Sequence, residues 1–150
     1  MTNGRLLKIE RSMSLVSLIY VSQSEIANER AESEIESIVE WSKAFNATVG
    51  ITGALIFTGT HFSQLLEGKS DPVHDLMASI ARDPRHTRVE IVSCEAIPAR
   101  RFPDWNMVYD GRSQFVSRHL ADVLTDQSSL ERERATGALT KLISEFTRAR

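Results

Sequence analysis

The sequence predicts an α+β fold of the ferredoxin-like type, with a β-α-β-β-α-β core followed by a fifth strand. Short apolar runs typical of strands alternate with amphipathic segments typical of helices, and a tight turn separates the second and third apolar runs. No repeat or long linker interrupts this order. Right-handed crossovers place both helices on one face of the antiparallel sheet. We expect two C-terminal helices to cap the other face.

The first strand and the first helix are expected in residues 14–21 and 32–45. Residues 14–21 form a nearly continuous apolar run rich in β-branched and aromatic side chains, which favours a strand buried on both faces. Residues 32–45 carry apolar side chains along one helical face. Ser33 and Glu36 have the spacing of a capping box, which predicts the start of this helix.

A hairpin and a second helix follow. Residues 51–57 and 61–66 are apolar runs separated by a short turn, in which Gly59 can adopt a positive φ. Ser70-Asp71-Pro72 supplies a capping side chain and a proline in the first turn, so the second helix begins there. It is expected to end near Asp83-Pro84.

Two more strands and two more helices complete the prediction. Residues 89–97 alternate as a strand, and residues 105–109 form a short fifth strand after a turn. Residues 114–124 and 130–146 have helical periodicity. We therefore divide the chain into an N-terminal extension (1–13), a core domain (14–110) and a C-terminal helical cap (111–150).

Composition favours a soluble globular protein. Apolar residues make up 41% and charged residues 25% of the chain, and the net charge is -2. This balance predicts no attraction to nucleic acid or to an anionic membrane. A single cysteine, Cys94, suits a reducing cytoplasm, and no apolar run is long enough to span a bilayer. We expect a cytoplasmic location.

Common enzyme and metal signatures are missing from the sequence. It contains no GxGxxG, P-loop, GxSxG or HExxH motif, and its histidines are scattered rather than set at zinc-ligand spacing. We therefore expect neither a metal site nor turnover catalysis.

Three polar residues interrupt or end apolar segments. Tyr20 ends the first strand, Asn46 follows the first helix, and Gln64 lies within the third strand. Buried amides and phenols need hydrogen-bond partners. Taken alone, these residues favour ordinary roles: Gln64 on a solvent face, Asn46 as a helix cap and Tyr20 as a core aromatic.

Five segments together support a more specific interpretation. The runs LIYVSQS, FNATVGITGAL, HFSQLLEG, DPRHTRVEI and RRFPDWNM, in this order and at these separations, resemble the BLUF photoreceptor family. The resemblance covers roughly residues 14–110 and is more specific than any single short motif. It implies a blue-light sensor that binds a flavin non-covalently between its two helices. The flavin is usually FAD, with FMN and riboflavin as alternatives.

The resemblance also assigns roles to individual residues, because Tyr20, Asn46, Gln64, Trp105 and Met107 match the family's switch. It implies that the phenol of Tyr20 donates an electron to the excited flavin. Gln64 then relays the proton, because an amide accepts on one atom and donates from another. Asn46 is expected to anchor the polar edge of the ring. Trp105 and Met107 are the expected output residues in the last strand.

Other residues near the implied site have more than one interpretation. Arg85, and with it His86, match a family segment near the dinucleotide end of the flavin, where a guanidinium can pair with phosphate. Alternatively, Arg85 only follows the end of the second helix. Trp41 is either a second electron donor or a packing or interface residue. Phe45 replaces a polar residue found in several relatives.

The leading hypothesis is a sensor that signals to a separate, unidentified effector protein through its last strand and C-terminal helices. A homodimer or larger homo-oligomer is expected, because an amphipathic tail can be shared between subunits. Two alternatives use the same fold: a flavin-free interaction module, and a small enzyme similar to acyl-phosphate hydrolases. The enzyme would need an Arg/Asn pair beside a phosphate-binding loop, and the sequence has no glycine-rich loop of that kind.

Overall fold

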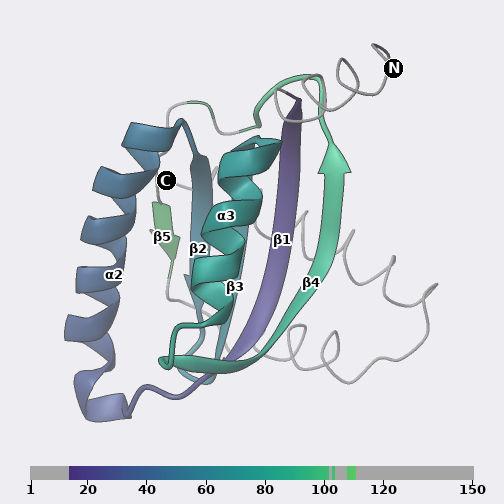
Figure 1. Cartoon of the computed structure of the whole chain (residues 1–150). Helices are drawn as coiled ribbons and strands as arrows, with labels where there is room; N and C mark the ends of the chain where they lie inside the picture. Colours follow the sequence, from purple (N-terminus) through teal and green to yellow (C-terminus); the bar gives the residue numbers. More distant parts are fainter. Residues whose placement is uncertain (1–13, 102, 104–107, 111–150) are drawn as a thin grey trace.

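The computed structural model describes residues 14–101, 103 and 108–110 of the chain. Its elements, in chain order, are β1 (Leu15–Ser24), α2 (Asn28–Val49), β2 (Thr52–Phe57), β3 (His61–Lys69), α3 (Ser70–Ala81), β4 (His86–Ala96) and β5 (Val108–Asp110) (Figure 1). The predicted order of strands and helices in the core is confirmed.

The strands form one sheet in the order β4-β1-β3-β2-β5. The pairings of β1 with β3, of β1 with β4 and of β2 with β3 are all antiparallel. Figure 1 shows α2 and α3 side by side on the same face of this sheet. The α+β class and the arrangement of both helices on one face are therefore confirmed.

The described part of the fifth strand, Val108–Asp110, lies at the edge of the sheet. Val108–Asp110 pairs in parallel with β2, so that Ala54 is opposite Val108. Residues 105–107, the first three of the predicted strand, lie outside the described residues, as do the extension 1–13 and the predicted C-terminal helices. The division into three parts and the helical cap remain predictions.

The start of the first helix differs from the prediction. The helix begins at Asn28, and Ala27 is its N-cap residue, whose side chain cannot accept a hydrogen bond. The predicted capping box is therefore wrong: Ser33 lies inside the helix, and its hydroxyl donates to the Arg30 carbonyl at 3.2 Å. The first turn is polar and carries no apolar period, so periodicity in the sequence locates the buried face of the helix but not its start.

The C-terminal end of the same helix matters for the site. The helix extends to Val49 and closes on Gly50, whose φ of 68° is in the left-handed region. The backbone carbonyl of Asn46 accepts hydrogen bonds from the N–H groups of Gly50 and Ile51. Asn46 thus lies in the last turn of α2 rather than after the helix.

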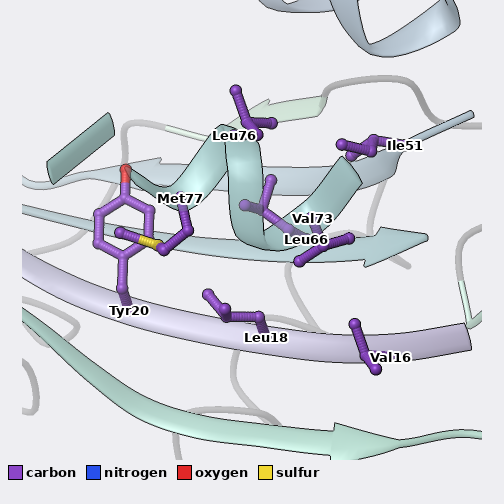
Figure 2. Packing of buried hydrophobic residues seen from close by; sticks show 8 residues of the cluster. All are labelled: Val16, Leu18, Tyr20, Ile51, Leu66, Val73, Leu76 and Met77. Carbon is purple, nitrogen blue, oxygen red and sulfur yellow. The ribbon is translucent and has the colours of Figure 1, made fainter. Parts of the chain in front are cut away.

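One apolar cluster attaches α3 to the sheet. Val16, Leu18 and Tyr20 alternate along β1 and point toward the helices, where they pack with Val73 and other side chains of α3. Figure 2 shows the ring of Tyr20 standing off β1 beside Met77. The intervening residues of β1 are also buried, so the predicted burial of this strand on both faces is confirmed.

A second apolar cluster attaches the N-terminal half of α2. Ile35 packs there with Leu55 and Phe57 of β2 and with Phe62 of β3. Phe45 and Val49, near the end of α2, pack against the first cluster instead. Between these two attachments, a space remains between α2 and α3. The candidate site lies in that space.

Removing a core side chain should destabilise this arrangement. Leu66 is fully buried in the first cluster, and we expect Leu66→Ala to lower the free energy of unfolding by about 2–5 kcal/mol because it leaves a cavity. Ile91, which is 46% exposed on β4, is the control, and Ile91→Ala should change stability by less than about 1 kcal/mol. Urea denaturation measures both, and equal losses would contradict the assignment of the core.

Candidate functional site

A cavity of about 510 Å³ lies between α2 and α3, above the sheet. This volume is within the range of pockets that bind small organic ligands. The cavity is lined by Tyr20, Ser37, Ile38, Trp41, Ser42, Asn46, Leu55, Phe62, Gln64, Leu76, Ser79, Ile80, Asp83, Arg85 and His86. Most of the surface that lines the cavity is apolar, and polar groups reach it from the sheet, from both helices and from the residues that follow α3.

The floor holds a hydrogen bond between two buried polar side chains. Tyr20 and Gln64 are directly opposite each other in the pairing of β1 with β3, and both lie on the face covered by the helices. They are only 3% and 6% exposed. The Tyr20 hydroxyl donates to Oε1 of Gln64 at 2.7 Å. The alternative that Gln64 points to solvent is therefore wrong.

The surroundings of Tyr20 keep its hydroxyl protonated. Burial raises the pKa of the phenol well above its usual value, and the negative charge of Asp83 raises that pKa further. Tyr20 is therefore a neutral donor across the physiological range. Its edge also meets the imidazole of His86 in a T-shaped contact, with ring centroids 6.0 Å apart.

Asn46 and Ser42 bring polar groups to the wall formed by α2. Both are buried, and they lie four residues apart on the helical face that lines the cavity. The prediction singled out Asn46 only. The signal for Ser42 was in the sequence: a small polar residue on the buried face of an amphipathic helix, where an apolar residue is usual.

Arg85 lies at the polar end of the cavity and is already paired. Its Nε donates to both carboxylate oxygens of Asp83, at 2.9 and 3.1 Å. These hydrogen bonds hold the pKa of Asp83 below its usual range. The prediction missed Asp83, which it treated only as the end of a helix. A contact between Arg85 and a phosphate stays a prediction.

His86 is buried, and both of its ring nitrogens bond to the protein. Nε2 lies 2.6 Å from the Ile80 carbonyl, and Nδ1 lies 2.7 Å from the Ser22 hydroxyl. Because a carbonyl can only accept, Nε2 carries a proton. The ring therefore ties the start of β4 to α3 and to β1. With both nitrogens engaged, the imidazole can contact a ligand in the cavity only by packing against it.

Trp41 and Phe45 form a stacked pair on α2. Their ring centroids are 4.8 Å apart with an interplanar angle of 7°. Trp41 lines the cavity and is still 59% exposed, so it lies at the mouth. Of the two expectations for Trp41, this contact favours packing.

The predicted output residues Trp105 and Met107 lie outside the described residues. The roles assigned to them remain predictions.

A family model described as "BLUF: Sensors of blue-light using FAD" matches residues 15–108 of the chain. The chain belongs to the BLUF family. The matched range contains all of β1 to β4 and every residue that lines the cavity. The members of this family are flavin-binding sensors of blue light.

Relatives and solved structures agree with this membership. The chain is 39% identical over 88 residues to the blue light- and temperature-regulated antirepressor BluF of Escherichia coli, and it is 34% identical over 95 residues to photoactivated adenylate cyclase subunit beta of Euglena longa. The two matches span 59% and 63% of this chain but only 21% and 11% of those much longer proteins. The BLUF protein BlrB in its dark state superposes with a TM-score of 0.68 at 32% identity, over 85% of this chain and 98% of that chain.

BlrP1 of Klebsiella pneumoniae, solved with FMN and cyclic diGMP, superposes with a TM-score of 0.60 at 29% identity. That match covers 71% of this chain and 29% of BlrP1. It is a further example of this fold as one part of a larger protein.

Neither a metal site nor a membrane span was found in the described part of the chain. No three His, Cys, Asp or Glu side chains lie close enough there to hold a metal ion. No helix among those residues combines the length and the apolar character needed to cross a bilayer.

The chemistry of the cavity fits a flavin. The pyrimidine edge of the flavin ring alternates carbonyl and N–H groups, and the amides of Asn46 and Gln64 can complement both kinds of group. Ile38 and Leu76 offer apolar contacts from the two opposing helices, as a flat aromatic ring requires. Donors, acceptors and apolar walls are therefore present in one space of suitable size.

The burial of Tyr20 predicts abnormal alkaline titration. The chain has two tyrosines, and we expect one of them to ionise in the folded protein only above the usual pKa of about 10. Tyr20→Phe should remove this late step from the absorbance at 295 nm, and Tyr109→Phe should keep it. Because the folded pKa is raised, its contribution to stability is complete below pH 10 and is lost as the pH rises through the folded pKa. Ionisation of both tyrosines near pH 10 in folded protein would contradict this.

Proposed function

We propose that this chain senses blue light through a switch formed by Tyr20 and Gln64 beside a non-covalently bound flavin. The observation that carries the proposal is the 2.7 Å hydrogen bond between these side chains on the floor of the cavity. One partner in this bond, the phenol of Tyr20, can be oxidised. The other partner, the amide of Gln64, can rotate or tautomerise. Membership of the BLUF family supports the same conclusion.

The cavity residues suggest how the flavin is held. Asn46 binds the polar edge of the ring from α2, and Gln64 binds it from β3. Arg85 binds phosphate if the guanidinium is shared with Asp83 or released from it, and His86 packs beside that end. FAD is the proposed cofactor, and FMN and riboflavin are the alternatives; the relative BlrP1 has been solved with FMN.

The proposed switch moves a proton along an existing hydrogen bond. A bound flavin excited by blue light is a strong one-electron oxidant. Tyr20 is the proposed electron donor, and loss of an electron makes its phenol strongly acidic. The proton then passes from the hydroxyl to Oε1 of Gln64, which already lies 2.7 Å away. As the electron and the proton return to Tyr20, the amide is left rotated or tautomerised and presents a different group to the cavity.

The outcome is a change of state rather than turnover. Tyr20 and Gln64 keep their composition, so the switch only biases two arrangements of the protein. We propose that Trp105, Met107 and the C-terminal helices pass this change to a separate effector protein, and that the chain works as a homodimer or larger homo-oligomer. Antirepression and cyclase activity are named for the relatives, each of which is much longer than this chain.

The enzyme alternative is less well supported. A small acyl-phosphate hydrolase would need an arginine and an asparagine at one phosphate site, and Arg85 and Asn46 do line the same cavity. The sequence, however, has no glycine-rich phosphate-binding loop of the kind that such an enzyme needs. A flavin-free interaction module would not need the buried pair of Tyr20 and Gln64, whose desolvation costs free energy.

The absorption spectrum tests the proposed function. We expect purified protein to carry a flavin spectrum that shifts slightly to the red under blue light and recovers in darkness. Tyr20→Phe should bind flavin and lose this shift, because the electron donor is missing. The same substitution at Tyr109 is the control and should keep it. A normal shift in Tyr20→Phe would refute the role of Tyr20, and protein that binds no flavin would support the interaction module instead.

Flavin selectivity tests the role of Arg85. We expect Arg85→Ala to weaken FMN and FAD binding about tenfold and to leave riboflavin binding unchanged, because only the phosphorylated forms use the guanidinium. Asp83→Asn should strengthen FMN binding, since it frees Arg85 from its ion pair. Fluorescence titration with the three flavins measures these affinities. An equal loss for all three in Arg85→Ala would indicate a general packing role.

A further inference from the structure

A row of polar residues crosses the sheet on the face opposite α2 and α3. Glu95 of β4 pairs with Ser17 of β1, Ser17 pairs with Glu67 of β3, and Glu67 pairs with Thr52 of β2. Ser17 lies between Val16 and Leu18, which face the helices, so the row points the other way. We call these four residues the crossover row. The proposed switch does not use them.

The chain that leaves β4 is bonded to this row. The backbone N–H of Arg101 donates to Oε2 of Glu67 at 2.7 Å, although Glu67 is fully buried. The side chain of Arg101 meets Glu95 at 3.3 Å in an exposed ion pair. After Arg101 the chain must continue to β5 at the opposite edge of the sheet, where it pairs with β2. Figure 1 shows the described residues that follow β4 turning away from the end of that strand.

Arg100 joins this segment to three other elements at once. Its Nη1 donates to Oγ1 of Thr52 at 3.1 Å and to the backbone carbonyl of Glu67 at 2.9 Å. Its Nη2 donates to the carbonyl of Gly50 at 2.5 Å. Gly50 closes α2 four residues after Asn46, and Glu67 lies three residues after Gln64 on β3. One guanidinium therefore contacts both elements that carry the amides of the cavity.

We propose that Arg100 is a positioning residue that couples the cavity to the segment leading into β5, and thereby sets the lifetime of the light-induced state. The inference rests on the proposed function, because it concerns the regulation of the same switch. The planar guanidinium is suited to this task, since it can serve diverging acceptors that an ammonium group cannot reach together. The carbonyls of Gly50 and Glu67 and the hydroxyl of Thr52 are acceptors in fixed places. With Arg100 bonded to all three, the end of α2, β2, β3 and the segment that contains Arg100 must move together.

The dark-recovery rate of flavin-loaded, full-length protein tests this inference. We expect Arg100→Ala to bind flavin, to show the red shift and to recover roughly threefold to tenfold faster, because a rearrangement that breaks fewer hydrogen bonds has a lower barrier. Arg100→Lys should not restore the parent rate, since it keeps the charge but not the fork. Arg101→Ala is the matched control. It keeps the backbone N–H that donates a hydrogen bond to Glu67 and loses only an exposed ion pair, so it should recover at the parent rate.

Each result has a defined meaning. An Arg100→Ala rate equal to or slower than that of the parent overturns the inference, and so does an equal acceleration in Arg101→Ala. If Arg100→Ala does not fold, Thr52→Val decides by the same criterion, because it removes one acceptor and keeps the shape of the side chain.

Failure of the proposed function would be visible separately. If the parent protein shows no light-induced shift, that function is wrong, and amide hydrogen exchange then tests the coupling alone. Arg100→Ala should accelerate exchange at the Arg101 amide and in β5 relative to Arg101→Ala. Unchanged exchange at both places would overturn the inference.

Discussion

The antiparallel register of β1 against β3 is the constraint on which the site depends. In this register Tyr20 lies opposite Gln64, and alternation places both side chains under the helices. A slip by one residue would carry Tyr20 to the other face and separate the phenol from the amide. Leu18 opposite Leu66 belongs to the apolar cluster that holds α3. The packing that stabilises the fold therefore also selects the hydrogen bond in the cavity.

The buried side chains of Tyr20 and Gln64 provide hydrogen-bond partners for each other. This explains why the site needs both a phenol and an amide. A phenol or an amide without a partner at this depth would cost free energy, while a mutual bond in a low-dielectric setting is strong and directional.

The cavity above Tyr20 and Gln64 links ligand binding to the stability of the fold. A ligand that binds only the folded protein stabilises it by mass action. Filling the cavity between α2 and α3 should therefore strengthen their attachment to the sheet.

Sequence patterns located the core elements well, because each depends on local periodicity. The shared face of the two helices followed from general rules of connection. The start of α2 was missed because a polar first turn carries no periodic signal, and the expected capping box at Ser33 was wrong.

At the site, Tyr20, Asn46 and Gln64 were identified through a family resemblance rather than through their chemistry. Asp83 was predicted only as the end of a helix, and Arg100 was given no role of its own. Their importance comes from contacts between segments distant in sequence, as in the bond from Arg100 to Thr52. No local pattern records such contacts.

The strand pairing is more extensive at the centre of the sheet than at the edge formed by β5. β1 and β3 pair over nine residue positions, whereas the described residues of β5 pair with β2 over three. A strand at the edge of a sheet has a neighbour on one side only, so it opens more easily than a central strand. The central pairing that holds Tyr20 against Gln64 is protected from such opening. We therefore expect opening at β5 to leave the framework of the cavity folded.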